Sequence, residues 1–402
     1  MKKGLFATTA IVAAAAAVSM APQNAAAQDD GGINLGVGGY YEFYYTASDQ
    51  DEPQGQNNDF RTDRVRQEGE IEFSGDTTLD NGITVGVNVQ LEAYTKGDQI
   101  DEHYAFVEGS FGRFQIGAEN SAPYAMQVIA PSVGINANSP DYLPFSTQLG
   151  AFPTTVVGVS PGLTSGGSSD APKLTYFTPR LAGFQLGASY APDTQNTGGA
   201  SQGAGLIQDE DAGVDQGRAY SLGANYTQSF NGVDVAASLG YETVEDDDDT
   251  AVTTTGGTTV VTSVFPTTTT TIGGTQTGTG VNNDDDFESY TAGLNIGYAG
   301  FTVGGSYLQN DDDAGDEQAY DLGVSYRTGP WGASVTWLHV DFDPNGTNAE
   351  PTHDTAVGSL TYALGPGITA NANLHYFAED ADVQGGYDGD GYGASAGLML
   401  SF

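Results

Sequence analysis

Apolar and polar residues alternate with a period of two along most of this chain, and the pattern is clearest in residues 390–402. One parity of that segment holds Tyr392, Ala394, Ala396, Leu398, Leu400 and Phe402. The other parity holds Gly393, Ser395, Gly397 and Ser401. Such a segment is typical of a β-strand with one apolar face and one small or polar face. A soluble sandwich would hide its apolar faces in a core, whereas a membrane protein would turn them toward lipid.

The same alternation recurs upstream and predicts 16 strands. Their expected ranges are 33–46, 64–79, 83–95, 101–109, 113–119, 172–179, 183–191, 218–229, 232–243, 287–299, 301–309, 318–328, 331–340, 354–364, 367–378 and 390–402. In 101–109 the two faces are ambiguous, because Tyr104 and Phe106 share a parity with Glu102 and Glu108.

The connections between these strands alternate between short and long. The short ones are 80–82, 109–112, 180–182, 231–232, 299–300, 329–330 and 365–366, and several are Asn-Gly or Gly-Pro pairs that favour tight turns. The long ones are 47–63, 96–100, 120–171, 192–217, 244–286, 310–317, 341–353 and 379–389. Short turns at one rim and long loops at the other are typical of an antiparallel transmembrane β-barrel. An even strand number places both chain ends at the short-turn rim.

Aromatic residues gather at the strand ends on the apolar parity. They include Tyr45, Tyr94, Tyr190, Tyr226, Phe230, Tyr241, Tyr298, Phe301, Trp331, Tyr376 and Phe402. Two rings of such residues are expected at the two membrane interfaces of a barrel. Ordinary strand propensity of aromatic residues is the alternative explanation.

The N-terminal residues and the composition indicate an exported protein. Lys2 and Lys3, the apolar run 5–20 and the Ala triplet 25–27 predict a signal peptide over residues 1–27, which leaves 28–402 as a single barrel domain. No later segment has the roughly 18 continuous apolar residues of a membrane helix. The chain has no cysteine, and its net charge of −41 makes nucleic acid an implausible partner.

The sequence offers no candidate catalytic residues. The four histidines, His103, His339, His353 and His375, sit singly, without a recognisable nucleophile motif around them. A hydrolytic barrel would need a nucleophile and a base oriented by a third group. We therefore expect that the protein is not an enzyme.

Acidic residues are concentrated in the expected long loops, including the Thr-rich connection 244–286. The clusters comprise Asp246, Asp247, Asp248, Asp249, Asp284, Asp285, Asp286, Asp311, Asp312 and Asp313. Carboxylate oxygens suit Ca²⁺ or Mg²⁺, and such ions would link the loops to anionic lipopolysaccharide. None of the clusters has the residue order of an EF-hand, and solvation of surface loops explains them as well. We therefore expect no defined metal site and no cofactor.

Two stretches carry a family resemblance: 77–87 (TTLDNGITVGV) and 173–193 (KLTYFTPRLAGFQLGASYAPD). With the terminal Phe402 they resemble the general bacterial porins, specifically the 16-stranded trimeric type of alphaproteobacteria. The resemblance implies an outer-membrane homotrimer in which the third long connection, 120–171, folds into each barrel and narrows it. It also implies that the last strand, with Tyr392, Leu398, Leu400 and Phe402, is the insertion signal read by the barrel-assembly machinery.

Charged residues on the expected lumen faces are the candidates for the pore constriction. Arg64 and Arg66 share a parity with Glu68, Glu70 and Glu72, and Arg61 lies just before them, so the arginines are expected on the basic side of the narrowing. Local pairing with the neighbouring glutamates is the alternative. Lys173, Arg113 and Lys96 are weaker candidates. Connection 120–171 contains two acids, Asp141 and Asp170, with Glu119 at its start, which departs from the acid-rich loop of the family.

Acids outnumber bases on the expected lumen faces, where Glu42, Glu92, Asp234, Glu242 and Asp321 join the glutamates at 68, 70 and 72. A barrel of about 16 strands leaves an aqueous channel. We therefore expect passive diffusion of ions and small hydrophilic solutes with a preference for cations, by field rather than by a fixed ion site. A substrate-selective channel and a structural or adhesive barrel remain the alternatives.

Overall fold

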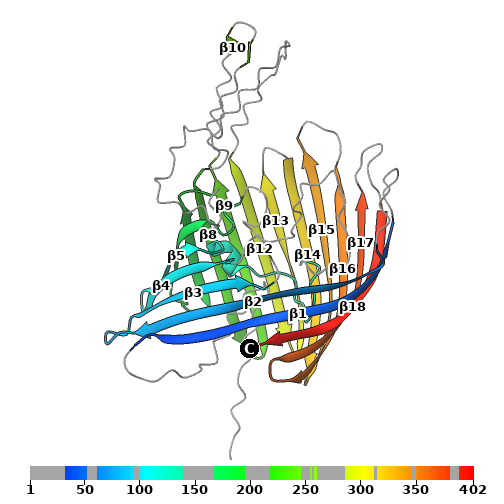
Figure 1. Ribbon diagram of the computed structural model, residues 1–402, viewed down its shortest axis with the longest axis horizontal. Coiled ribbons are helices and arrows are strands. Elements are labelled where there is room, and N and C mark those ends of the chain that lie inside the picture. The colour runs from blue at the N-terminus through cyan, green and yellow to red at the C-terminus, as the bar shows by residue number, and fades with distance from the viewer. Residues whose placement is uncertain are drawn as a thin grey trace, which may run out of the picture.

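The computed structural model describes residues 32–51, 61–93, 100–138, 167–194, 217–245, 286–311, 315–345, 350–380 and 389–402, together with the backbone of 254–255 and 258–259. These residues form a closed antiparallel barrel in which each strand pairs with its sequence neighbours and β1 closes on β18 (Figure 1). Its strands are β1 (Asn34–Gln50), β2 (Asp63–Thr78), β3 (Thr84–Glu92), β4 (His103–Gly109), β5 (Gly112–Ala118), β6 (Pro172–Phe177), β7 (Phe184–Ala191), β8 (Ala219–Phe230), β9 (Val233–Val244), β12 (Phe287–Tyr298), β13 (Phe301–Asp311), β14 (Gly315–Thr328), β15 (Trp331–Pro344), β16 (Thr352–Gly365), β17 (Ile368–Asp380) and β18 (Gly389–Ser401).

All 16 strands predicted from the alternation are confirmed, and their ends differ from the predicted ones by a few residues. Two further strands of two residues each, β10 (Thr254–Thr255) and β11 (Thr258–Thr259), pair with one another inside the Thr-rich connection. Among the described residues, no helix is both long enough and apolar enough to cross a membrane.

Strand pairing settles the ambiguous segment 101–109. In β4, Val107 lies opposite Val85 and Phe114, which are exposed on the outer surface. Phe106 lies opposite Gln115, which is buried on the lumen side. Tyr104 and Phe106 therefore face the lumen together with the acids of the same parity. The lumen is more aromatic at this wall than a simple polar face predicts.

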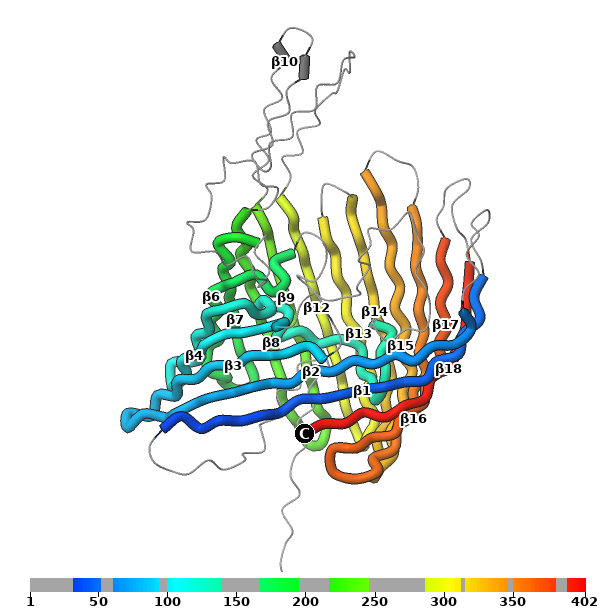
Figure 2. The backbone as a smooth tube through the Cα atoms, in the orientation of Figure 1, coloured from blue at the N-terminus to red at the C-terminus, as the bar shows by residue number. Residues whose placement is uncertain are grey.

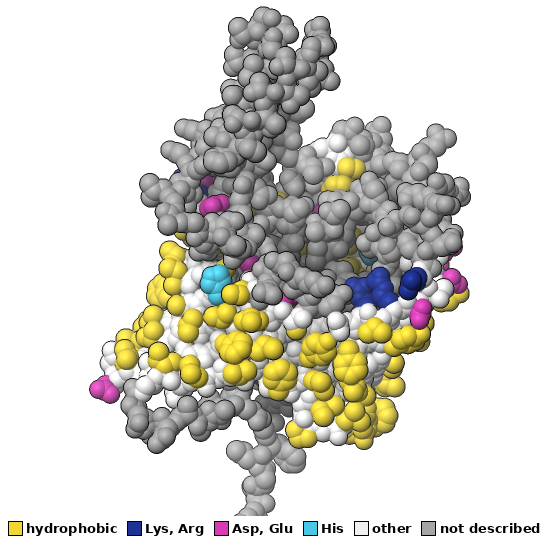
Figure 3. All heavy atoms as spheres, in the orientation of Figure 1, with side chains coloured by type: hydrophobic (Ala, Val, Ile, Leu, Met, Phe, Trp, Pro, Cys, Tyr) yellow, Lys and Arg dark blue, Asp and Glu magenta, His cyan; other side chains and the backbone are white. Residues whose placement is uncertain are grey.

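Large hydrophobic side chains are exposed on the outer surface, as a lipid-facing wall requires. Leu374 and Val65, for example, are each 70% exposed. In the space-filling view, hydrophobic side chains cover the face of the barrel that carries β1–β4 and β18 (Figure 3). Exposure of this kind would be unfavourable in water and is expected for the lipid face of a barrel.

Aromatic side chains form contacts at both ends of the strands. Near the short turns the ring pairs are Phe184–Tyr226, Phe301–Tyr326 and Trp331–Tyr362, with centroids 4.4, 4.2 and 4.6 Å apart. Near the long connections they are Tyr190–Tyr220, Tyr241–Tyr290 and Tyr307–Tyr320, at 5.3, 5.1 and 5.5 Å. This confirms the prediction of two aromatic girdles.

The two girdles differ in what their polar tips contact. On the long-loop side, Tyr241 and Tyr290 both donate to Glu288, at 2.7 and 2.8 Å, and the indole N–H of Trp337 donates to Asp354 at 2.9 Å. On the short-turn side, the phenol of Tyr176 donates to a backbone carbonyl at 2.6 Å. At the rim that bears the acidic connections, carboxylates thus accept hydrogen bonds from the aromatic girdle.

The tight turns have the backbone conformations that their sequences predict. Asn231 and Gly232, between β8 and β9, have φ of +51° and +84°. Two consecutive residues in the left-handed region match the right-handed twist of the flanking strands, and Asn-Gly adopts this conformation at little cost.

The C-terminal strand β18 closes the barrel against β1. Leu398 and Leu400 lie opposite Phe43 and Tyr41 on the outer face. Phe402 continues the ladder beyond β18, because its N–H donates to the carbonyl of Gly39 at 3.1 Å and its carbonyl accepts from the N–H of Gly39 at 3.0 Å. The expected insertion signal is therefore an exposed, paired strand end, and its role in assembly stays a prediction.

Candidate functional site

A segment between β5 and β6 leaves the wall and lies inside the barrel (Figure 2). It begins with helix α1 (Ala122–Met126), which has a proline in its first turn and contacts β6–β9. The chain then continues without helix through residues 127–138 along the lumen side of the strands from β12 onward. We call residues 121–138 the pore loop. For its described part, connection 120–171 folds inward as expected.

The wall beneath the pore loop has glycines at lumen-facing positions. A Cβ atom at Gly293 of β12 would collide with the backbone carbonyl of Val128. Four further wall glycines have the same close relation, because a Cβ on each would lie 2.7 to 3.0 Å from an atom of the pore loop: Gly187, Gly223, Gly240 and Gly323. Only a residue without a side chain lets the pore loop approach the wall so closely.

Wall side chains satisfy the backbone of the pore loop. The hydroxyls of Ser189, Ser238, Ser334 and Thr336 accept hydrogen bonds from the N–H groups of Ala122, Val128, Val133 and Ala137, at 2.8 to 3.1 Å. The amide of Asn295 donates to the carbonyl of Ile129 at 3.0 Å. Non-helical backbone inside a barrel needs such partners, since buried and unpaired N–H and C=O groups are costly.

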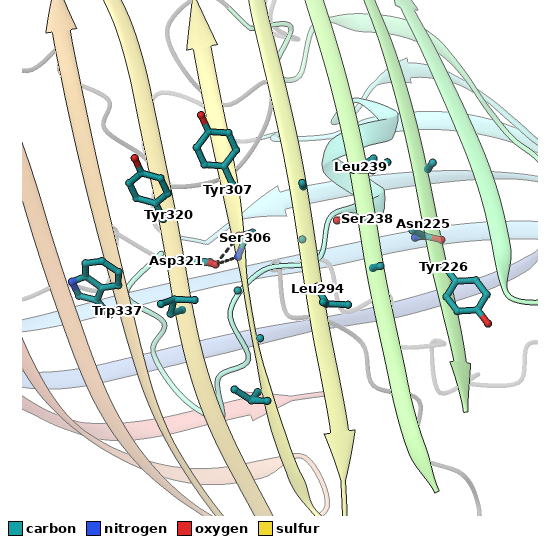
Figure 4. A pocket seen from close by; sticks show the side chains of 18 of the residues that line it. Asn225, Tyr226, Ser238, Leu239, Leu294, Ser306, Tyr307, Tyr320, Asp321 and Trp337 are labelled. Atoms are coloured by element: carbon teal, nitrogen blue, oxygen red, sulfur yellow. Dashed lines mark hydrogen bonds between the residues drawn. The ribbon is translucent and has the colours of Figure 1, made fainter. Parts of the chain in front are cut away.

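One wall carboxylate binds the loop at its turn. Asp321 of β14 is 1% exposed, and its Oδ2 accepts the N–H of Ala130 at 3.0 Å and the Nδ2–H of Asn138 at 3.4 Å. Its Oδ1 accepts the N–H and the hydroxyl of Ser306, both at 2.6 Å (Figure 4). Although Asp321 has the lumen parity, it lies behind the pore loop instead of facing open water.

Besides these polar contacts, the lumen contains an apolar cluster. Ile135 and Ala137 of the pore loop pack in one buried group with residues of the wall: Tyr44, Leu308, Ala319, Leu338, Val340, Val357 and Phe377. These wall residues share the lumen parity of their strands, where water would normally require polar groups. The strands β13–β17, Tyr44 of β1 and the pore loop therefore enclose a buried apolar cluster inside the barrel.

Both ends of connection 120–171 meet at Lys173 of β6. Lys173 is 3% exposed, and its ammonium group donates to the carbonyls of Glu119 and Ser169, the latter at 2.5 Å. Glu242 of β9 accepts the N–H of Ser168 at 2.7 Å and the hydroxyl of Ser221 at 2.8 Å. We call Lys173, Glu242 and the groups that they bind the clasp, because they join the two ends of the connection to the wall.

Two carboxyls outside the strands border the clasp and have raised pKa values. Burial, together with the nearby Asp170 and Asp101, raises the pKa of Glu102 to about 8. Burial and the nearby Glu102 raise the pKa of Glu119 well above its usual range. The amide of Asn120 donates to Glu102 and favours its ionised form, but burial prevails.

The opposite wall, formed by β1–β4, carries charge. On β2 the lumen parity reads Arg64, Arg66, Glu68, Glu70 and Glu72 from the long-loop rim inward, in agreement with the predicted parity. Neighbouring strands add to this wall: Glu42 lies opposite Glu68, and Glu92 lies opposite Glu70. The carboxylates of Glu70, Glu92 and Asp101 lie within 4.8 Å of one another. The pore loop that faces this wall has no charged residue in 121–138.

The remaining sequence candidates lie elsewhere. Arg113 pairs with Glu108 at 3.1 Å, and its guanidinium carbon lies 3.9 Å from the ring centroid of Phe106, so it is held toward the short-turn end of the lumen. Arg61 is exposed just before β2. Asp141 and Lys96 lie outside the described residues, as do all the candidate divalent-binding acids except Asp286 and Asp311.

On the outer surface, small residues leave an apolar groove of about 950 Å³ across β7–β9 and β12–β15 (Figure 4). Ala237, Ala292 and Gly305 form part of its floor, and exposed residues such as Leu239, Leu294 and Leu322 flank it. It belongs to the lipid-facing surface and is separated from the lumen by the wall.

Sequence reasoning missed the residues that hold the pore loop. Asp321 and Glu242 were grouped with the water-facing acids because parity alone does not tell what covers a lumen residue. The available signal was the run of glycines and small hydroxyl residues on the lumen parity of successive strands, such as Gly240 and Ser238 on β9. Such positions fit a backbone lying against the wall.

Comparison with known families gives a match over nearly the whole chain. The sequence model described as "Gram-negative porin" matches residues 7–382. An uncharacterised protein of Rickettsia prowazekii is 24% identical over 349 residues, which is 77% of each chain. An uncharacterised protein of Rickettsia typhi is 23% identical over 342 residues, which is 75% of each chain.

Solved structures of similar fold are also porins and channels. OmpF of Salmonella typhi, in complex with daunomycin, superposes with a TM-score of 0.58 at 13% identity and covers 94% of this chain and 99% of its own. The outer membrane channel DcaP of Acinetobacter baumannii gives 0.55 at 13% identity with the same coverage. An anion-selective porin from Comamonas acidovorans gives 0.54 at 14% identity and covers 92% of this chain and all of its own.

Proposed function

Because this chain belongs to the Gram-negative porin family, and is therefore a channel-forming protein of the outer membrane, we propose that it passes ions and small hydrophilic solutes by diffusion with a preference for cations. The family and the fold indicate a channel rather than an enzyme. The preference for cations is the specific part of the proposal.

The charged wall opposite a neutral pore loop is the observation that carries this proposal. Glu42, Glu68, Glu70, Glu72 and Glu92 line the wall, against Arg64 and Arg66 nearer the long-loop rim. On this wall five carboxylates stand against two guanidiniums, so the sum of its charges is negative. A net negative potential in a confined, low-dielectric passage concentrates cations.

The selectivity of a fold neighbour gives no guide here. The Comamonas acidovorans porin is anion-selective, but at 14% identity the likeness concerns the fold alone. Selectivity depends on the side chains that line the passage, and a likeness of fold does not specify them. The cation preference therefore rests on the residues of this chain.

The proposal includes the assembly expected from the sequence. A homotrimer inserted by the barrel-assembly machinery, with its long loops among lipopolysaccharide molecules, is consistent with an exposed apolar face on β1–β4 and β18. A structural neighbour, OmpT of Vibrio cholerae, was solved in a trimer form. Analytical ultracentrifugation of the purified protein in detergent tests the trimer directly.

Conductance of the purified protein in a planar lipid bilayer tests the function. Stepwise ohmic currents are expected, and a KCl gradient should give a reversal potential of the sign that marks cation preference. A reversal potential favouring Cl⁻ would contradict the cation preference and leave the channel function intact. Absence of any current steps would contradict the channel itself.

A further inference from the structure

We propose that Asp321 is a positioning residue that fixes the pore loop against the wall, and so sets the width of the channel without meeting the passing solute. This inference rests on the proposed channel function. It assigns to a buried wall carboxylate a role that neither its charge nor its parity reveals.

The two oxygens of Asp321 bind two different parts of the protein. Oδ1 accepts two hydrogen bonds from Ser306 on the neighbouring strand β13, both at 2.6 Å, which fixes the rotamer of the carboxylate. Oδ2 accepts from Ala130 and Asn138 of the pore loop, at 3.0 and 3.4 Å. Asp321 therefore links the wall to the loop. Its contacts with Ser306 fix the carboxylate, and the carboxylate in turn fixes the loop.

The turn of the pore loop is built around this bridge. The amide of Asn136 donates to the carbonyl of Ala130 at 3.0 Å, and its Oδ1 accepts the N–H of Asn138 at 3.3 Å. The turn has two arms, one with Ala130 and one with Asn138, and donors from both arms point toward Asp321. A hydroxyl accepts few hydrogen bonds at a time, whereas an ionised carboxylate offers about four lone-pair sites, and this explains the residue type.

Other wall contacts of the loop do not replace this one. Ser238 and Ser334 each receive one loop N–H, from Val128 and Val133. Within the described part of the wall, Asp321 is the side chain that receives hydrogen bonds from both arms of the turn. Its removal takes the acceptor from the buried N–H of Ala130 and one hydrogen bond from Asn138, in a place where water has little access.

Three variants test the inference in planar bilayers. Asp321→Ala removes every acceptor, and Asp321→Asn keeps the shape and one acceptor oxygen. Asp234→Asn is the control, because it removes a lumen-parity acid of β9 near the short turn. Its carboxylate accepts a hydrogen bond from the hydroxyl of Ser229 and, among the described residues, none from the pore loop. It reproduces the loss of one charge without loss of a loop contact.

The frequency of brief transitions in the open-channel current is the measurement. Losing hydrogen bonds to a charged acceptor should raise that frequency about tenfold or more in Asp321→Ala, with a smaller rise in Asp321→Asn. Asp234→Asn should shift the reversal potential and leave the transition frequency unchanged. Liposome swelling with sugars of increasing size should show a higher size limit for Asp321→Ala.

The outcomes separate this inference from the channel function. If wild-type protein conducts and Asp321→Ala fluctuates no more than Asp234→Asn, Asp321 does not position the loop and the channel function stands. If wild-type protein does not conduct, the proposed function fails first. Should Asp321→Ala not fold, judged by circular dichroism, the Asn variant decides, and quiet currents from it would overturn the inference.

Discussion

The two walls of the lumen are made in opposite ways. The wall of β12–β17 is covered by the pore loop and buries glycines, hydroxyls and an apolar cluster that includes Leu338 of the wall and Ile135 of the loop. The wall of β1–β4 displays the arginines and glutamates of β2, and Tyr44 of β1 is its residue in the apolar cluster with the pore loop. Under the proposed function, one wall gives the passage its shape and the other gives it its charge. In this barrel the two properties are therefore separable by mutation, which is not so where the loop itself carries the acids.

If the covered wall sets the shape, a side chain at Gly293 should have the largest effect. Gly293→Val would place atoms where the carbonyl of Val128 lies. Such overpacking costs about 1–3 kcal/mol, which the loop relieves by leaving the wall. We expect a large change in single-channel conductance and loss of its uniformity. Gly358→Val is the control, because a Cβ there meets nothing within 4 Å. Equal conductance in both variants would show that the wall does not hold the loop.

If the wall of β1–β4 sets the charge, neutralising it should alter selectivity and leave shape unchanged. The triple variant Glu68→Gln, Glu70→Gln and Glu72→Gln removes three lumen carboxylates of one strand. The reversal potential in a KCl gradient should move toward zero, since two glutamates, Glu42 and Glu92, then remain on this wall beside two arginines. The size limit for neutral sugars should stay the same. A change in that limit with no change in reversal potential would reverse the roles of the two walls.

The clasp should respond to pH, because it joins the covered wall to the ends of connection 120–171. The pKa of Glu102 is about 8 in the folded protein and 4.5 in the unfolded reference. The folded form therefore binds the proton more tightly, so the stabilising contribution is complete below pH 4.5 and is lost as pH rises through about 8. Current fluctuations should be more frequent at pH 8.5 than at pH 5. In Glu102→Gln this pH difference should shrink, and an unchanged difference would assign it to other groups.

The smallest effect is expected from divalent ions at the acidic connections. These acids include Asp286 and Asp311 at the ends of β12 and β13, and Asp311 already accepts a hydrogen bond from Gln309 at 2.8 Å. Without a fixed arrangement of ligands, Ca²⁺ binds weakly. We expect no resolvable shift in the thermal unfolding midpoint in millimolar Ca²⁺. A clear rise that Mg²⁺ does not reproduce would indicate a defined site.

The fold was predictable because each strand must be apolar toward lipid along its own length. That requirement is local, so alternation in segments such as 83–95 and 390–402 reveals the strand and its faces without knowledge of its neighbours. The rule weakens in β4, where Phe106 faces inward beneath Arg113 and the lumen is not simply polar. In β4, contacts with the neighbouring strands determine which side chains face the lumen. The sequence of that strand alone does not contain this information.

The charged wall was predictable for the same reason, since Arg64 and Glu68 share a parity on one strand. The loop contacts were not, because they join residues far apart in the chain, such as Ala130 and Asp321. Parity states which way a side chain points and leaves open whether water or protein covers it. Lys173 illustrates this: its lumen parity suggested a pore cation, whereas the structure buries it among backbone carbonyls.

The apolar cluster inside the lumen also has a consequence for folding. Tyr44 belongs to β1, and it shares the cluster with Ile135 of the pore loop and Phe377 of β17. Its phenol accepts a hydrogen bond from Asn371 at 3.1 Å, across the seam where the first strand meets the last. Docking of the loop and closure of the ring therefore stabilise each other. A barrel whose loop has not docked therefore lacks part of the contacts that hold its first strand beside its last strands.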